Sequence, residues 1–250
     1  MLGNVEKYLL DKIQAERTIH MTLIDPEKVT PQQASKIVEN STSSGTSAIM
    51  IGGSTFVSQS HLDNVIKAIK RTVKIPTILF PNNITGISRH ADAIWFMSLL
   101  NSTDPYFLIG AQVLGAPLVK KYGLEPISMG YVIVGEGGTA GIVGKAIPVP
   151  YDKPELAAAH ALAGQYLGMH FLYLEGGSGA KNPVPPEMIH AVKHYVDIPV
   201  IVGGGIRTKE QGLAAASAGA DVIVTGNVIE GADAGRKISE IIEGIKIATS

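Results

Sequence analysis

The sequence predicts a (β/α)8 barrel, or TIM barrel, in which eight parallel strands close into a ring surrounded by helices. The chain of 250 residues contains eight short apolar runs, and helical patterns separate most of them. The runs are almost continuously apolar, as parallel strands covered on both faces should be. Eight strand–helix units fit the usual size of this barrel. A doubly wound open sheet is the structural alternative.

The predicted strands recur along the whole chain without an intervening linker. They cover residues 19–25, 47–53, 75–81, 92–101, 125–134, 170–177, 198–206 and 221–227. Helices are expected at 31–44, 61–72 and 105–122, among others. Thr208 and Gln211 match a capping box that opens the helix after the seventh strand. Residues 1–250 are therefore expected to form one domain.

The third unit departs from this pattern because its connection is too short. Only "NNITGISRHA" separates Pro81 from Asp92, whereas a crossover with its helix usually needs at least about 10–12 residues. We expect a loop or a single turn in place of the third helix. The next strand carries the apolar run from Ile94 to Met97. Either an apolar slot opens between helices two and four, or a trimmed loop covers an ordinary core.

Composition excludes several classes of function. The formal net charge is -1 and no basic tract is present, which argues against nucleic acid as a partner. With no cysteine, disulfides and thiolate chemistry are excluded. The amphipathic N-terminal stretch contains acids and does not resemble a signal peptide. No apolar run approaches the roughly 18 residues of a membrane span. A soluble, cytoplasmic protein without a transmembrane segment is expected.

Glycine-rich loops follow the last three predicted strands. They contain Gly176, Gly177 and Gly179 after strand six, Gly204 and Gly205 after strand seven, and Gly226 with Asn227 after strand eight. Glycine lets backbone N–H groups converge on one anion, and the common phosphate site of these barrels follows strands seven and eight. Ordinary tight turns are the simpler explanation of any single loop. Three together favour a phosphate monoester.

Glu175 stands at the end of strand six, directly before the first glycine loop. A carboxylate repels phosphate, so Glu175 is the candidate catalytic residue, expected to bind a substrate hydroxyl and either to orient it only or also to accept its proton. Tyr173 lies two residues earlier and points to the same side of the strand. A substrate with both a phosphate and hydroxyl groups suits this pair. A helix-capping or ion-paired acid is the alternative.

Asp25 ends the first strand, on the far side of the predicted barrel mouth. One carboxylate there could bind Mg²⁺, which usually takes one or two carboxylates together with substrate phosphates. Ser54, after the second strand, could supply a further oxygen. The alternative is that Asp25 only opens the turn "DPEK".

Other features carry weaker signals. "TAGIVGKA" lacks the first glycine and the closing Ser/Thr of a phosphate loop. His190 and His194 have helical metal-ligand spacing but no third ligand, which favours surface histidines. Arg207 and Lys181 are interpreted as solvated. The glycine-rich segment 135–150 is expected to be a mobile or interface loop.

Six motifs in order resemble the geranylgeranylglyceryl phosphate synthase family and its bacterial heptaprenyl relatives. They are "LIDPEK", "IGGST", "SLLNS", "YLEGGSG", "VGGGIR" and "TGN". The resemblance implies a modified TIM barrel without a regular third helix. It also implies Mg²⁺-dependent transfer of a prenyl group, expected to be geranylgeranyl, from its diphosphate to the 3-hydroxyl of sn-glycerol 1-phosphate. This reaction makes the first ether bond of archaeal membrane phospholipids.

The resemblance also assigns roles to individual residues. It implies Asp25 and Ser54 as metal ligands. The implied contacts to glycerol 1-phosphate are Tyr173, Leu174, Glu175, Gly176, Gly177, Ser178, Gly179, Gly204, Gly205, Gly226 and Asn227. The family forms dimers and hexamers, so a homo-oligomer is expected. Trp95 and the long fifth loop are similar to the larger archaeal subgroup.

The resemblance favours the apolar slot over a trimmed loop, with Trp95, Phe96 and Tyr106 as expected lining residues. Two rival functions remain open on the sequence alone. A sugar-phosphate isomerase or aldolase would share the glycine loops, although no strand end carries a Schiff-base lysine. A non-catalytic phosphometabolite-binding scaffold would have no use for Asp25 facing Glu175.

Overall fold

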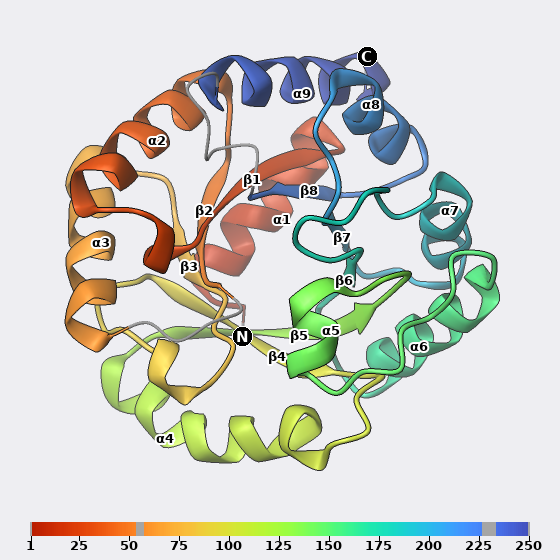
Figure 1. Cartoon of the computed structure of the whole chain (residues 1–250), viewed down its shortest axis with the longest axis horizontal. Helices are drawn as coiled ribbons and strands as arrows, with labels where there is room; N and C mark the ends of the chain where they lie inside the picture. The colour runs from red at the N-terminus through yellow and green to blue at the C-terminus, as the bar shows by residue number, and fades with distance from the viewer. Residues whose placement is uncertain (1, 54–57, 227–233, 250) are drawn as a thin grey trace.

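The chain forms a closed barrel of eight parallel strands. The computed structural model describes residues 2–53, 58–226 and 234–249. Each strand pairs with the next, and β1 pairs with β8 to complete the ring (Figure 1). The strands are β1 (Ile19–Ile24), β2 (Ala48–Ile51), β3 (Thr77–Leu79), β4 (Ala93–Leu99), β5 (Glu125–Ile133), β6 (Phe171–Glu175), β7 (Val200–Gly203) and β8 (Val222–Thr225). The predicted TIM barrel is confirmed, and closure excludes the open sheet.

Helices surround this ring (Figure 1). They are α2 (Pro31–Ser44), α3 (Gln59–Thr72), α4 (Ala111–Tyr122), α6 (Pro154–Tyr166), α7 (Pro186–Tyr195), α8 (Lys209–Ser217) and α9 (Ala234–Thr249). The predicted capping box is present at the start of α8, where Thr208 accepts from the backbone of Gln211. Within the described part of the chain, no helix is long and apolar enough to cross a membrane.

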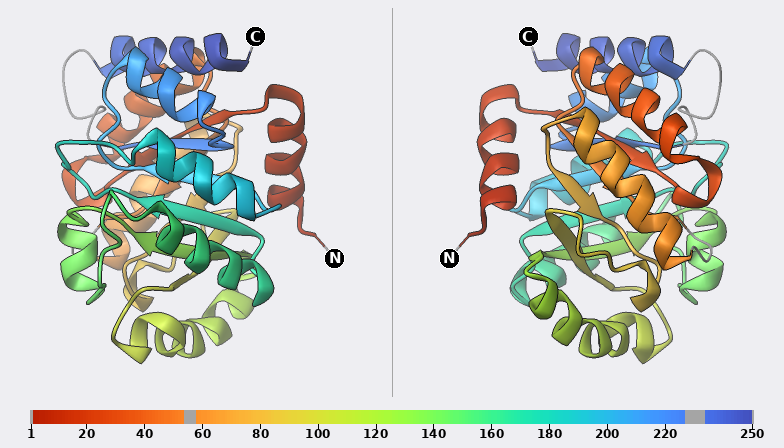
Figure 2. Two further views of the ribbon diagram at one scale, coloured as in Figure 1. Left: turned by 90° about the vertical axis from the view of Figure 1, so that its right-hand side faces the viewer. Right: turned by 90° about the vertical axis from the view of Figure 1, so that its left-hand side faces the viewer.

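Helix α1 (Asn4–Glu16) lies across one end of the barrel instead of along its side (Figure 2). Leu9 is fully buried against the side chains that fill the barrel interior. The Glu125 carboxylate, from the start of β5, accepts the backbone N–H groups of Val5 and Glu6 at 2.8 and 2.7 Å. These bonds satisfy donors that a helix N-terminus leaves unpaired. The N-terminal end of the barrel is thereby closed.

Successive side chains of each strand point to opposite faces, and this divides the apolar core into an inner and an outer part. On β6, Phe171 and Tyr173 belong to the inner core, while Leu172 and Leu174 face the surrounding helices. The inner core is filled by large side chains, including Trp95, which packs edge-on against Phe171 with ring centroids 5.1 Å apart. Side chains therefore fill the lower barrel, which leaves only the C-terminal mouth for a substrate.

The connection between β3 and β4 contains no regular helix. A single 3-10 turn, η2 (Ile84–Gly86), occupies it, as its length predicts. Strand β3 has three residues and pairs with β4 at only two positions, Ile78–Ala93 and Leu79–Ile94. On its other side β4 pairs with β5 at seven consecutive positions. Beyond Leu79, the wall between β3 and β4 is therefore not closed by backbone hydrogen bonds.

Two segments differ from the sequence-based expectation. The helix expected at 105–122 begins as a π-helical turn, η3 (Tyr106–Gly110), and becomes α-helical only from Ala111. The Ser98 hydroxyl donates to the Leu108 carbonyl at 2.7 Å, so a contact with β4 competes with regular α-helical pairing there.

The segment 135–150, expected to be a loop, contains the short helix α5 (Gly138–Val143). This helix begins directly against the loop after β6. A Cβ added at Gly138 would lie 3.2 Å from the Ser178 carbonyl oxygen, and one at Gly177 would lie 2.8 Å from the Gly138 nitrogen. Glycine at both positions allows the two backbones to approach, and α5 thus becomes part of the barrel mouth.

Candidate functional site

The candidate site lies at the C-terminal mouth of the barrel, opposite α1, where barrel enzymes place their active sites. Strand β6 ends at Glu175, and the side chains of Tyr173 and Glu175 both point inward. Tyr173 is 1% exposed and Glu175 is 6% exposed. A nearly buried carboxylate at a strand end is costly unless it is hydrogen-bonded, so its partners define the site.

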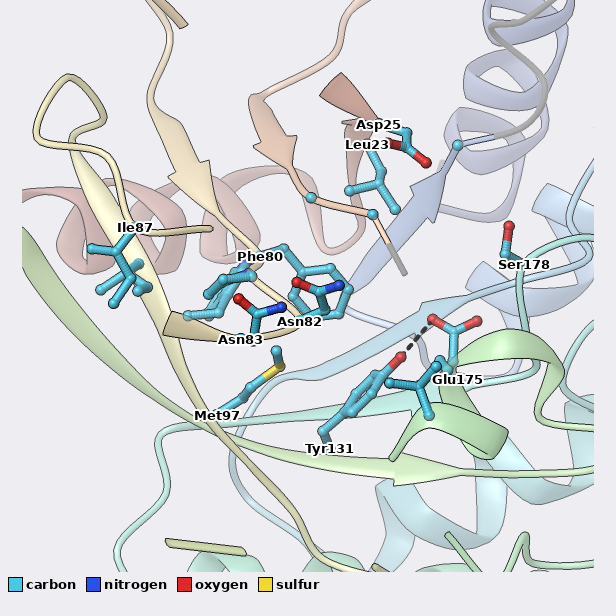
Figure 3. Close-up of a pocket in the computed structure, with 18 of the residues that line it drawn as sticks. Leu23, Asp25, Phe80, Asn82, Asn83, Ile87, Met97, Tyr131, Glu175 and Ser178 are labelled. Carbon is cyan, nitrogen blue, oxygen red and sulfur yellow. Dashed lines mark hydrogen bonds between the residues drawn. The ribbon is translucent and has the colours of Figure 1, made fainter. Parts of the chain in front are cut away.

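Three groups donate hydrogen bonds to the Glu175 carboxylate. The Gly177 backbone N–H donates to Oε1 at 2.7 Å, and the Tyr131 hydroxyl donates to Oε2 at 3.2 Å (Figure 3). The Tyr173 hydroxyl is the third donor. The carboxylate is thus held in one orientation from three sides. The partners match neither a helix cap nor an ion pair, which were the alternative explanations for this acid.

Burial raises the pKa of the Glu175 carboxyl above its usual value, and these three hydrogen bonds oppose the shift. Burial also raises the pKa of the Tyr131 and Tyr173 hydroxyls well above their usual range, with the Glu175 charge as the second cause. Both tyrosines therefore stay protonated and act as donors. A carboxylate with a raised pKa is a better proton acceptor than an exposed one.

A small hollow of about 60 Å³ opens beside Glu175, bounded by the loops that follow β6, β7 and β8. Its size suits a group such as a phosphate. The predicted substrate-binding residues among its lining are Tyr173, Glu175, Ser178, Gly179, Gly204, Gly205 and Gly226. Arg207, which the sequence analysis interpreted as solvated, also lines it.

The loops after β6 and β7 fit together so closely that side chains are excluded. Gly204 and Gly205 have φ values of 84° and 78°, in the left-handed region that favours glycine. A Cβ on Gly204 would lie 2.6 Å from both Glu175 Oε1 and the Gly177 nitrogen. The glycines therefore allow the two loops to pack closely around the hollow, which an ordinary turn would not require.

The remaining predicted positions lie elsewhere. The Leu174 side chain is buried between barrel and helices, because neighbouring residues of a strand face opposite sides. It lines neither cavity of the site. Gly176 and Gly177 stand behind the hollow, where their N–H groups bond Gly203 and Glu175. Ser54 and Asn227 lie outside the described residues.

Asp25 caps the 3-10 turn η1 (Pro26–Lys28), and its Oδ1 accepts the Glu27 N–H at 3.1 Å. The turn-opening role considered for Asp25 is therefore present. The same side chain is half-buried and lines the barrel mouth opposite Glu175 (Figure 3). A Cβ on Gly53 would lie 2.5 Å from Asp25 Oδ1, so glycine lets the carboxylate pack against the residue that follows β2.

A second, much larger cavity of about 790 Å³ extends from the mouth through the barrel wall. At the mouth it is lined by Asp25, Glu175 and Ser178. It then passes Phe80, Tyr131 and Met97 and reaches the gap beyond β3. The apolar residues Ile84, Ile87, Ile94, Phe96, Gly115 and Val119 line its outer part, between η2 and α4. The slot predicted from the missing helix is confirmed as a cavity.

The expected lining of this slot is correct for two of three residues. Trp95 and Phe96 line it, but Tyr106 does not, and the neighbouring Phe107 does. The π-helical turn explains the difference, because it changes the direction in which successive side chains of this segment point.

Phe80 and Tyr131 were not identified from the sequence, although both line the larger cavity. With Tyr173 they form three mutually contacting rings beside Glu175. Phe80 stacks on Tyr173 and meets Tyr131 edge-on, with centroids 5.5 Å apart in both pairs. Strand alternation alone would point Tyr131 inward, but its place beside Tyr173 follows only from the observed strand pairing.

The two histidines with metal-ligand spacing lie outside the site, whereas the glycine-rich segment 139–146 contributes Ala140, Val143 and Gly144 to the lining of the larger cavity. His190 and His194 are exposed on α7, as expected of surface histidines. "TAGIVGKA" forms α5 and the turn after it, not a phosphate loop. Among the described residues, no group of three or more His, Asp or Glu gathers as a metal cluster.

Comparisons with known proteins identify relatives that match almost the whole chain. A model of the PcrB family matches residues 11–245. Geranylgeranylglyceryl phosphate synthase from Thermococcus gammatolerans is 54% identical over 250 residues, covering 98% of this chain and 99% of that protein. The synthase from Thermofilum pendens is 55% identical over 230 residues, covering 92% and 90%.

A solved structure gives the same result in three dimensions. The crystal structure of (S)-3-O-geranylgeranylglyceryl phosphate synthase from Thermoplasma acidophilum, in complex with its substrate sn-glycerol-1-phosphate, superposes with a TM-score of 0.94. It is 42% identical and covers 99% of this chain and 100% of that one. The chain therefore belongs to the PcrB family, as a relative of the archaeal geranylgeranylglyceryl phosphate synthases.

Proposed function

We propose that the protein transfers a geranylgeranyl or similar prenyl group from its diphosphate to the 3-hydroxyl of sn-glycerol 1-phosphate. The observation that carries this proposal is the position of Glu175, which lines both the small polar hollow and the large apolar cavity. A phosphate-bearing acceptor and a long apolar donor would meet at this carboxylate. The names of the relatives and the substrate bound to the Thermoplasma acidophilum enzyme support the same reaction.

In the proposed complex, the acceptor phosphate occupies the hollow between the glycine loops. Backbone N–H groups that converge there can bind a dianion without a salt bridge. The terminal hydroxyl of the glycerol then reaches Glu175, which is held by Gly177, Tyr131 and Tyr173. Orientation of this hydroxyl contributes to the rate because the two reacting atoms start close together.

The proposed step makes one bond and breaks one. The C–O bond between the allylic carbon and the diphosphate breaks, and its electron pair leaves with the diphosphate. The 3-hydroxyl oxygen of the acceptor bonds to that carbon, and its proton passes to the Glu175 carboxylate. The raised pKa of Glu175 suits it as this general base.

The residues present fit one Mg²⁺, which we propose as the cofactor. Asp25 offers a carboxylate at the mouth, where it lines the larger cavity. One carboxylate together with substrate phosphates is a usual Mg²⁺ environment. When bound, the ion supplies positive charge that stabilises the departing diphosphate. We retain Ser54 and Asn227 as proposed ligands of metal and acceptor, respectively, because of the family resemblance.

We also propose that the chain works as a homo-oligomer in the cytoplasm. Large apolar side chains are exposed on the outside of η3 and α4, at Ile109, Val113 and Leu114. Exposed apolar groups of this kind often mark contacts between subunits.

The proposed function is tested by product formation. Purified protein is incubated with Mg²⁺, sn-glycerol 1-phosphate and radiolabelled prenyl diphosphates of several lengths, and lipid products are separated by chromatography. We expect a prenylated glycerol phosphate, and little or none with the enantiomer sn-glycerol 3-phosphate or after chelation with EDTA. If no donor yields a prenylated product, the proposal is rejected.

A further inference from the structure

Arg207 follows the loop after β7 but bonds to the loop after β6. Its Nη2 donates to the Ala180 carbonyl at 2.6 Å. Its Nη1 lies 3.5 Å from the Lys181 carbonyl and 3.4 Å from the Gly205 carbonyl. The guanidinium donates to backbone carbonyls of both glycine loops, and the side chain also lines the hollow.

These contacts fix the direction of the peptide groups around the hollow. In a trans peptide the C=O and the N–H point in opposite directions, and every described peptide bond is trans. The Gly205 carbonyl turns toward Arg207, so the N–H of Ile206 in the same peptide points away from it. Ile206 itself lines the hollow. Arg207 thus fixes the direction of peptide groups in both loops beside the hollow.

The base of Arg207 is itself anchored. Its backbone N–H donates to the Gln211 side chain at 2.7 Å, within the capping box that begins α8. On the other side, the Tyr151 hydroxyl donates to the Asn182 carbonyl at 3.2 Å. A Cβ on Gly205 would lie 2.7 Å from the same carbonyl oxygen. The loop after β6 is therefore held between two fixed elements.

We propose that Arg207 is a positioning residue for the acceptor phosphate: it binds the loops after β6 and β7 together so that their N–H groups face one anion. This inference rests on the proposed function, since it specifies how the same acceptor site is organised. Arg207 acts through the backbone it orients, with its positive charge as an additional attraction for a dianion. Arginine suits this role because its planar guanidinium presents several N–H donors in one fixed geometry, whereas the lysine ammonium is a compact charge on a flexible stem.

Calorimetric titration with sn-glycerol 1-phosphate tests the inference without turnover. We expect the Arg207→Met variant to bind about tenfold to hundredfold more weakly, since hydrogen bonds from a charged donor are lost. The Arg207→Lys variant should be intermediate. Lys209→Met is the matched control: it removes the same charge two residues away, where the side chain pairs with exposed Glu243, and it should bind normally.

Kinetics distinguish positioning from general damage to the fold. For Arg207→Met, we expect a higher KM for the acceptor, with kcat at saturating acceptor and the donor KM within about twofold of wild type, since the lost contacts serve acceptor binding alone. Methylguanidinium added to Arg207→Ala should restore part of the affinity. Wild-type affinity in Arg207→Met, or full affinity in Arg207→Lys, would overturn the proposal.

Failure of the proposed function and failure of the proposed role of Arg207 give different results. If the wild-type protein binds no sn-glycerol 1-phosphate, the proposed function fails, and titration with inorganic phosphate then decides the role of Arg207. Weaker phosphate binding by Arg207→Met than by Lys209→Met supports the inference. Equal binding by the two variants, or no phosphate binding by the wild type, contradicts it.

Discussion

At the scale of single residues, Glu175 combines two requirements that usually conflict. It must remain a carboxylate to accept a proton, yet it is 6% exposed. Burial raises its pKa, and bonds from Gly177, Tyr131 and Tyr173 oppose this rise. Unlike a permanent ion pair, this set of neutral donors leaves the carboxylate able to exchange its proton during turnover.

Replacing Glu175 by glutamine should remove the base while preserving the shape of the site. We expect kcat to fall about 10²–10⁴-fold, the range typical of general acid–base catalysis. Binding of sn-glycerol 1-phosphate should largely survive, because the glycine loops are unchanged. Single-turnover kinetics and calorimetry measure the two quantities separately. Near-normal turnover of Glu175→Gln would rule out the proposed base.

The pH dependence of the rate should report the same carboxyl group. A protonated Glu175 cannot accept a proton, so kcat/KM should decline as the pH falls through its raised pKa. The acid limb of the profile should therefore lie above the usual pKa of a glutamate. Tyr131→Phe removes one bond that lowers this pKa, and we expect it to move the limb to still higher pH. A limb unmoved by this substitution would contradict the assignment.

The contrast between Glu175 and Tyr131 shows what the sequence can reveal about single residues. Glu175 was identifiable because an acid between an apolar strand and a glycine loop is unusual. Tyr131 lies within an apolar strand, where an inward tyrosine is indistinguishable from an ordinary core residue. Only strand pairing places it beside Tyr173. Ser54 and Asn227 rest on their positions after strands two and eight and on the family resemblance, since both lie outside the described residues.

At the scale of elements, the gap beyond β3 arises from two features acting together. The short connection supplies only η2 where a helix would cover the wall, and the brief β3–β4 pairing leaves the wall itself open. Helix α4 presents Gly115 to this gap, so the slot is not filled from the outside. A Cβ on Gly115 would lie 3.3 Å from Ile87 Cδ1.

A larger side chain at position 115 should narrow the slot. For Gly115→Leu, we expect kcat/KM with geranylgeranyl diphosphate to fall about 10- to 100-fold, as overpacking of a close-fitting site would cause. The shorter geranyl diphosphate should be affected much less. The exposed neighbour Ala116 provides the control variant Ala116→Leu. Equal losses with both donors would show that the slot does not hold the prenyl chain.

Some elements could be predicted from the number of residues between strands. Others could not, because tertiary contacts determine their structure. The missing third helix followed from the length of the connection alone. The π-helical turn at 106–110 could not be anticipated, because it depends on contacts with β4 such as that between Ser98 and Leu108. Likewise, α5 packs against the loop after β6. Its glycines predicted a loop, because the sequence does not show that they allow two backbones to pack closely.

At the scale of the whole molecule, stability and chemistry occupy opposite ends of the barrel. Helix α1 closes one end through Leu9 and the bonds from Glu125, and the reactive groups surround the other. The closed topology was predictable from the number of strand–helix units. The function of α1 as a cover was not, because an amphipathic helix can pack on many surfaces.

This separation predicts that the closed end can be weakened without changing substrate binding. Leu9→Ala should lower the free energy of unfolding by about 2–5 kcal/mol, the usual cost of a large cavity in a core. Affinity for sn-glycerol 1-phosphate should remain that of the wild type. Urea denaturation gives the first quantity, with exposed Leu2→Ala as control. A loss below about 1 kcal/mol would indicate that α1 is dispensable for the fold.

The opening in the barrel wall has a consequence for how such an enzyme can diversify. Residues that line its outer part belong to the β3–β4 connection, β4 and α4, whereas the carboxylate ends β6 and the glycine loops follow β6, β7 and β8. Substitutions in two such separate groups should change free energies independently and add when combined. The barrel can thus acquire a preference for a longer or shorter hydrocarbon while the residues that form the ether bond stay unchanged.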